Sequence, residues 1–145
     1  MSQPAQTLHQ ATAITGADPF ATRIETGVAE THAIASDAPA EHGGQGRGPS
    51  PVDLLTAALA SCKSMTASMY ARRKGWPVES IAFDVRHVRR ATDDGKPRDA
   101  FVCVMTITGD LDEEQRRKVY EISGRCPVHL MLAQKTIVES SLAEV

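Results

Sequence analysis

Short alternating segments open the chain and are followed by one long apolar run. Residues 11–36 are rich in Thr, Ile and Val and are broken at Gly16 to Pro19 and at Gly27. This pattern predicts two or three short antiparallel strands. Residues 37–48, with one Pro and four Gly, predict a loop that leads into the next element.

The clearest helix start in the sequence is "SPVD". Ser50 suits the N-cap, Pro51 the first helical position, and Asp53 can reach back to the N-cap amide. No helix breaker follows until Gly75, which comes after three basic residues that favour a helix C-terminus. The pattern therefore predicts one long helix that begins at Pro51.

The first two thirds of this helix are apolar or small nearly all round, and a chain of 145 residues can hardly enclose such a helix alone. We therefore predict a homodimer with this helix at the interface. On a helical wheel Cys62 shares a face with Leu55, Ala58, Leu59, Met65, Thr66 and Met69. That face favours a cysteine packed under the sheet.

Two segments with a period of two, 78–91 and 99–109, predict a hairpin around an Asp-Gly turn. Cys103 shares a strand face with Phe101, Met105 and Ile107, which favours a buried thiol without chemistry. Two helices should follow: the first is capped by Asp112 and Gln115, the second is opened by Pro127, and residues 135–145 could form an edge strand. Strands, a long helix, a hairpin and two helices predict a single α+β domain over residues 1–145.

Composition narrows the classes of function. The net charge of -2, the pI near 6.2 and 4% aromatic residues argue against binding to nucleic acid. No membrane span or signal peptide is recognisable, so we expect a soluble, cytoplasmic protein. The three cysteines are an odd number without a C-x-x-C pair, and the histidines lack metal spacing. We expect no metal and no cofactor, and any cysteine chemistry should be redox or nucleophilic.

Cys126 and Cys62 differ in their predicted surroundings. Cys126 precedes Pro127 and so should be a helix N-cap, where the dipole could lower a thiol pKa from about 8.5 to about 7. Simple capping of the helix is an equal alternative. Cys62 lies beyond the reach of the helix end and would need a nearby cation to act as a nucleophile. Three arginines are candidates, and the sequence does not choose among them: Arg23, Arg47 and Arg125.

The stretch "EHGGQGRGPSPVDLLTAALASCKSMTASMYARRKGW", followed later by "CPVH", resembles the OsmC/Ohr family of osmotically inducible and organic hydroperoxide resistance proteins. The likeness covers roughly residues 41–135. It implies an OsmC-like fold, an intertwined homodimer and a two-cysteine peroxidase of organic hydroperoxides in oxidative stress defence. By this resemblance Cys62 attacks the peroxide, Cys126 condenses with it to a disulfide, and an external dithiol reduces the pair.

One position departs from the family pattern. Val52 stands where the peroxidases carry a glutamate that pairs with an arginine over the reactive sulfur, and Asp53 should face away from Cys62. The sequence looks like a "GPSP...LL" branch that shares the cysteines but not always the charge network. The alternative function is a non-catalytic dimeric module that binds a small apolar or sulfur-containing ligand. Disulfide exchange on other proteins is less favoured without C-x-x-C.

Overall fold

The structure, a computed structural model, describes residues 6–143. Within the described residues, the chain forms two compact units, which divide between Leu55 and Thr56.

The first unit is built on a three-stranded antiparallel sheet in the order β1-β2-β3. The strands are β1 (Ala11–Thr15), β2 (Thr22–Thr26) and β3 (His32–Ser36), which confirms the prediction of short N-terminal strands. The loop after β3 contains a short 3-10 helix, η1 (Ala40–His42). Gly44 passes so close to Ala38 that a Cβ there would lie 1.9 Å from the carbonyl oxygen of Ala38.

The long helix α1 spans Pro51–Arg73 and is capped as the sequence predicts. Asp53 accepts hydrogen bonds from the backbone and hydroxyl of Ser50, and its own amide donates to the Ser50 hydroxyl. Gly75 ends the helix with a φ of 69°, a left-handed conformation that favours glycine. Local side-chain chemistry therefore sets both ends of α1.

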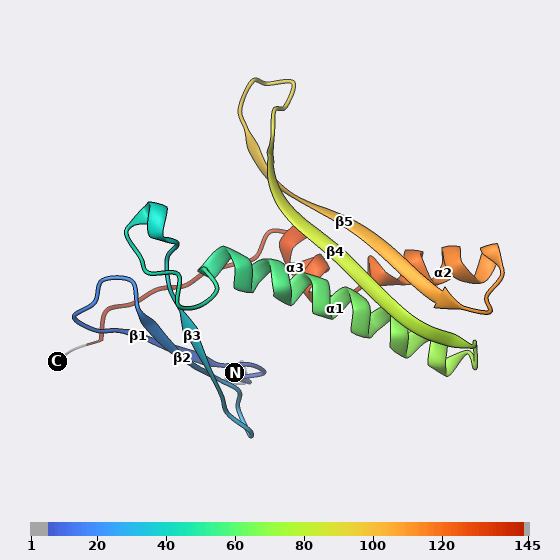
Figure 1. Ribbon diagram of the computed structural model, residues 1–145, viewed down its shortest axis with the longest axis horizontal. Helices are drawn as coiled ribbons and strands as arrows, with labels where there is room; N and C mark the ends of the chain where they lie inside the picture. The colour runs from blue at the N-terminus through green and yellow to red at the C-terminus, as the bar shows by residue number, and fades with distance from the viewer. Residues whose placement is uncertain (1–5, 144–145) are drawn as a thin grey trace, which may run out of the picture. The chain divides into compact units, whose positions relative to one another are not determined.

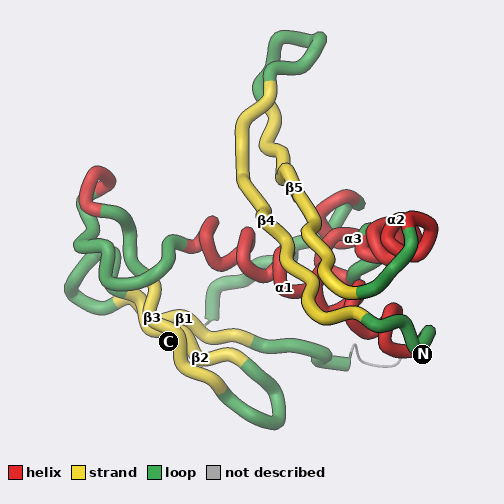
Figure 2. The backbone as a smooth tube through the Cα atoms, turned by 45° about the vertical axis from the view of Figure 1, so that its right-hand side comes forward, coloured by secondary structure: helices red, strands yellow, loops and turns green. Residues whose placement is uncertain are grey.

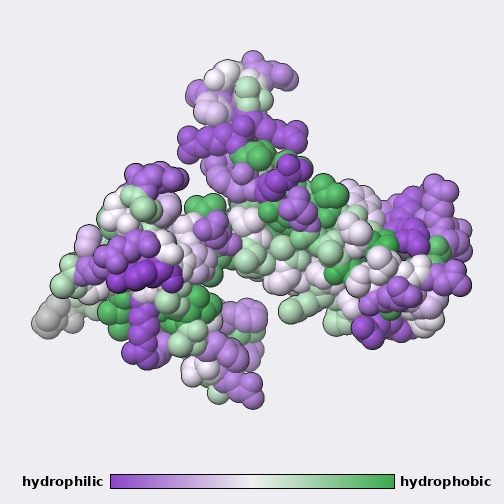
Figure 3. Space-filling view, viewed as in Figure 1, coloured by the Kyte–Doolittle hydropathy of each residue, from purple (hydrophilic) through white to green (hydrophobic). Residues whose placement is uncertain are grey.

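In the second unit, β4 (Val78–Arg90) and β5 (Arg98–Gly109) form a long antiparallel hairpin. Figures 1 and 2 show the hairpin lying over α1, with its turn extending beyond the helices. The space-filling view shows that this projecting end is mainly hydrophilic (Figure 3). The alternate residues of β5 from Phe101 to Ile107 are partly buried, as their shared face predicts.

Two shorter helices follow the hairpin: α2 (Glu113–Ser123) and α3 (Pro127–Ala133). Asp112 and Gln115 form the predicted reciprocal capping box of α2. Cys126 is the N-cap of α3, also as predicted. Residues 135–143 form no strand, and they are exposed throughout. The edge strand that the sequence suggested is therefore not formed by residues 135–143. A strand needs a paired neighbour to satisfy its backbone hydrogen bonds. The last two residues of the predicted strand lie outside the described residues.

The core of the second unit lies where α1 and α2 meet the hairpin. Ala67, Ala71 and Val119 are fully buried, and the partly buried side chains around them include Phe83, Met105 and Ile107 from the two strands. The buried residues of α1 repeat every fourth position: Leu59, Lys63, Ala67 and Ala71. This stripe differs from the predicted wheel face, since Met65 and Met69 are exposed on the single chain. The reason is the hairpin, whose partly buried side chains pack against Ala67 and Ala71 on this stripe.

Candidate functional site

The fold brings together the two cysteines that the sequence singled out. Cys62 lies on α1 and is half-buried, whereas Cys126 lies at the start of α3 and has no exposed surface. Their side chains lie close enough for the Cys62 thiol to influence the pKa of Cys126. Two thiols far apart in the sequence therefore meet in the second unit, with one sulfur more accessible than the other.

The surroundings of Cys126 hold it as a thiol. Burial is the largest influence and raises its pKa, and the neighbouring Cys62 raises it further. The amide of His129, which donates to the Cys126 Sγ over 3.3 Å, and the charge of Lys63 act in the opposite direction. Of the two alternatives for this N-cap, simple capping is the one that the structure favours: α3 is a helix of only 7 residues, and complete burial outweighs the effect of its terminus on the pKa of Cys126.

A lysine that the sequence reading overlooked is buried beside these sulfurs. Lys63 follows Cys62 on α1 and is 5% exposed. Its Nζ lies 3.3 Å from the Ser123 carbonyl oxygen and 5.5 Å from the centre of the Phe83 ring. Within residues 6–143, no carboxylate lies within 4 Å of this amine. The site thus contains a buried basic group close to two thiols.

His129 links the lysine to the buried cysteine. Its Nδ1 lies 3.2 Å from the Lys63 Nζ, and its backbone amide caps α3 through Cys126. The "CPVH" segment therefore places a sulfur and an imidazole at the same helix start, where the imidazole meets a side chain from α1. The sequence could predict this contact between Lys63 and His129 only if Lys63 were assigned to the buried stripe of α1.

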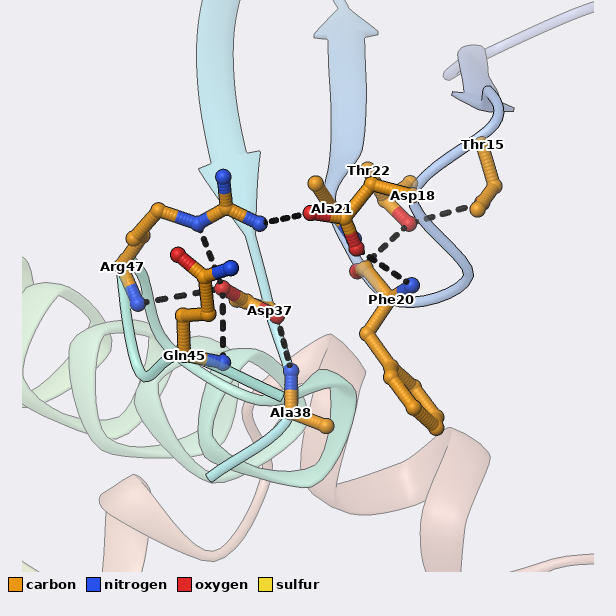
Figure 4. A network of polar contacts seen from close by, with 9 residues as sticks. All are labelled: Thr15, Asp18, Phe20, Ala21, Thr22, Asp37, Ala38, Gln45 and Arg47. Atoms are coloured by element: carbon orange, nitrogen blue, oxygen red, sulfur yellow. Dashed lines mark hydrogen bonds and ion pairs between the residues drawn. The ribbon is translucent and has the colours of Figure 1, made fainter. Parts of the chain in front are cut away.

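The predicted activating arginines have other partners. Arg23 in β2 pairs with Glu25 on the surface. Arg47 bonds Asp18 and, over 3.0 Å, the buried Asp37 (Figure 4). Both arginines belong to the first unit, so a role beside the sulfurs stays a prediction.

Asp37 organises the loop around Arg47. Its carboxylate accepts hydrogen bonds from the amides of Ala38, Gln45 and Arg47. The guanidinium of Arg47 is the main reason why the pKa of Asp37 lies below its ordinary range. The charge of Arg47 is thus already matched by carboxylates.

Arg125 directly precedes Cys126 and is exposed. It lines a shallow depression with Tyr70, Lys118, Glu121 and Ile122. An activating role for Arg125 also stays a prediction.

Two adjoining pockets open next to His129 in the second unit. The first has a volume of about 360 Å³ and is lined mainly by apolar side chains, among them Leu59, Phe101 and Leu132. The second, of about 290 Å³, contains Lys63 and Ser123. Phe101, Cys103 and His129 line both pockets. Cys103 is therefore half-buried beside the site, and the apolar lining of the first pocket comes from α1, β5 and α3.

No group of three or more His, Cys, Asp or Glu residues in positions 6–143 is arranged to hold a metal ion. Within that same range, no helix is both long and apolar enough to cross a membrane.

Comparison with known proteins places the chain in a family. Residues 43–141 match the family model described as OsmC-like protein. The chain belongs to the OsmC-like family. This confirms the resemblance carried by the glycine-rich segment, the long helix and the "CPVH" motif. No curated protein matches the sequence.

Solved structures of OsmC-like proteins share the fold at low sequence identity. An OsmC-like protein from Mycoplasma pneumoniae has a TM-score of 0.69 at 22% identity, over 89% of each chain. An organic hydroperoxide resistance protein OsmC from Legionella pneumophila has a TM-score of 0.64 at 20% identity, over 89% of this chain and 91% of that one. OhrB of Bacillus subtilis, an organic hydroperoxide resistance protein, gives 0.58 at 22% identity, over 87% and 90%. These likenesses confirm the predicted α+β, OsmC-like architecture.

Proposed function

We propose that this protein reduces organic hydroperoxides with Cys62 and Cys126 as a redox pair. The observation that supports this function best is that the fold brings the two thiols close together, one half-buried and the other fully buried. A half-buried sulfur can meet a substrate, whereas a buried neighbour is placed to attack the product of the first step. The family membership agrees with this division.

The proposed chemistry has three steps. The Cys62 thiolate attacks the terminal oxygen of ROOH, the O–O bond breaks, and the alkoxide leaves as ROH after taking a proton. Cys62 is then a sulfenic acid. The Cys126 sulfur attacks the Cys62 sulfur, a disulfide forms and water leaves. An external dithiol reduces that disulfide by exchange and is itself oxidised to a disulfide.

The apolar pocket supports organic hydroperoxides over hydrogen peroxide. Leu59, Phe101 and Leu132 line it, and its volume of about 360 Å³ is within the range of small-molecule sites. Burying an alkyl or aryl group there contributes about 25 cal/mol for each Å² of apolar surface removed from water. Hydrogen peroxide has no such group to bury.

The same pocket is the observation that favours the alternative function, a non-catalytic module for a small apolar ligand. The two functions differ in what happens to the thiols. One equivalent of cumene hydroperoxide should remove two of the three thiols per chain if the protein is a peroxidase. A pure binding module would keep all three thiols.

We also propose that the protein works as a homodimer with α1 at the interface. Met65 and Met69 are 69% and 60% exposed on the single chain. Figure 3 shows few strongly hydrophilic residues along the visible side of α1. Light scattering coupled to gel filtration should give twice the mass of one chain, 15.6 kDa.

Turnover with a dithiol reductant tests the enzymatic proposal. Cys62→Ser should abolish reduction of cumene hydroperoxide. Ser68→Ala is the matched control on α1, because the Ser68 hydroxyl accepts from Arg72 and takes no part in the proposed chemistry. Full turnover in Cys62→Ser would overturn the proposed function.

A further inference from the structure

Lys63 is a buried amine, and within residues 6–143 no carboxylate lies within 4 Å of it. A buried ammonium group is stable only if it is paired or hydrogen-bonded. Its contacts, the Ser123 carbonyl and the Phe83 ring, both favour a positive charge, but neither carries a negative one. Among the acids that face it, Glu121 lines the same pocket but pairs with Arg117 over 3.9 Å. The group left to supply a counter-charge is a thiolate of the adjacent cysteine pair.

The titratable groups around this amine come from several elements. From α2, Tyr120 and Glu121 line the pocket that contains Lys63, and from β5 Cys103 does. His129 and Cys126 belong to α3 and its N-cap, and Cys62 precedes Lys63 on α1. Of these, Cys62 and Cys126 are neighbouring thiols whose ionisation is linked, and the charge of Lys63 acts on Cys126 as well.

The contact between Lys63 and His129 fixes the state of the imidazole. An ammonium can only donate, so the Nδ1 atom 3.2 Å away must accept. In the tautomer that accepts at Nδ1, the ring N–H is at Nε2. A second positive charge on the ring would face the ammonium at hydrogen-bond distance. Because His129 lines both pockets, its N–H belongs to the wall where a substrate would bind.

We propose that Lys63 and His129 form the proton path of the peroxidase reaction: Lys63 holds the proton of the Cys62 thiol and returns it through His129 to the departing oxygen. This inference rests on the proposed function. Lys63 replaces the carboxylate-arginine pair that Val52 interrupts, and His129 acts as the general acid.

The path balances atoms and electrons. Cys62 gives its proton to the neutral amine of Lys63, which leaves a thiolate and an ammonium. The thiolate donates an electron pair to the terminal oxygen of ROOH as the O–O bond breaks. His129 gives its Nε2 proton to the alkoxide, which leaves as ROH, and takes a proton at Nδ1 from Lys63. Sulfenic acid, alcohol and the neutral amine result, with the peroxide reduced and the sulfur oxidised by two electrons.

The lysine step is tested by alkylation, which needs no peroxide. The rate at which iodoacetamide modifies Cys62 at pH 7, assigned by peptide mass spectrometry, should fall roughly tenfold or more in Lys63→Met, because an opposite charge within a few ångströms shifts ionisation by a unit or more. Lys63→Arg should stay within about threefold of the wild type, since it keeps the charge. Lys74→Met, one residue past α1, is the matched control.

The fold of the variants is checked by thermal melting. Methionine fills the space of the lysine stem and removes a buried charge, so the midpoint should not fall. If Lys63→Met fails to fold, Lys63→Gln takes its place, with the same expected loss of alkylation. Alkylation of Cys62 that is unchanged in the folded variant overturns the inference.

Two peroxides whose leaving groups differ in basicity test the histidine step. His129→Asn keeps an acceptor for Lys63 but loses the relay to Nε2. Its single-turnover rate with tert-butyl hydroperoxide, whose alkoxide needs a proton, should fall about a hundredfold. Its rate with peracetic acid, whose carboxylate leaves without one, should change less than about threefold. Equal losses with both peroxides indicate a merely structural histidine and overturn the relay.

Failure of the proposed function can be distinguished from failure of the proton path through Lys63 and His129. If the wild-type protein reacts with neither peroxide, the proposed function and the relay are wrong together. The alkylation result then still decides whether Lys63 pairs with the thiolate.

Discussion

Replacing Cys126 separates its structural role from its proposed redox role. The sulfur has no exposed surface and accepts the amide of His129 at the start of α3. Serine offers an oxygen acceptor at the same position and is among the preferred N-cap residues, whereas alanine offers none. We therefore expect Cys126→Ser to change the free energy of unfolding by less than about 1 kcal/mol. Cys126→Ala should cost about 1 to 2 kcal/mol, the usual loss for a cap plus an unsatisfied amide.

Cys126→Ser and Cys126→Ala should show the same catalytic defect. Without a second sulfur, Cys62 reacts once with cumene hydroperoxide and stops as a sulfenic acid. Dimedone should then label one Cys62 per chain, and turnover with a dithiol should fall at least about a hundredfold, because the disulfide can no longer form.

Urea unfolding measures the first effect, and dimedone labelling with mass spectrometry measures the second. Equal destabilisation by serine and alanine would refute the capping role. Wild-type turnover in Cys126→Ser would refute its role as the second cysteine.

Three further predictions concern the core, the pocket and the Asp37 network. Val119→Ala removes two methyl groups from a fully buried site and should lower the free energy of unfolding, measured with urea, by about 2 kcal/mol. An unchanged free energy of unfolding would show that this core is not tightly packed. Leu132→Ser should slow cumene hydroperoxide reduction roughly tenfold without slowing hydrogen peroxide, and equal effects would exclude the apolar pocket as the substrate site. Since Arg47 lowers the pKa of Asp37, the stability from that ionised group is present above the ordinary value near 3.9 and is lost as pH falls through the lower folded value. Hydrogen exchange of the Arg47 amide should stay slow down to about pH 4, and loss of protection between pH 7 and 5 would contradict this.

Local signals in the sequence predict most of the secondary structure correctly. The Ser50 and Asp53 cap of α1 and the Asp112 and Gln115 box of α2 depend on residues three apart, so the sequence is enough to find them. The period of two in residues 99–109 likewise identified the face of β5 that packs on the helices.

The electrostatics of the site were harder to predict, because burial depends on contacts between distant elements. The helix start at Cys126 left a lowered thiol pKa and simple capping as equal alternatives, and burial decides between them by raising the pKa. Lys63 escaped notice because lysine is almost always exposed. Its i and i+4 spacing from Leu59 and Ala67 was the signal that could have revealed it.

The disulfide formed on oxidation tests the central claim most directly. After one equivalent of cumene hydroperoxide, peptide mapping without reduction should find Cys62 joined to Cys126 and Cys103 still free. A disulfide that includes Cys103, or three free thiols in every chain, would contradict the account.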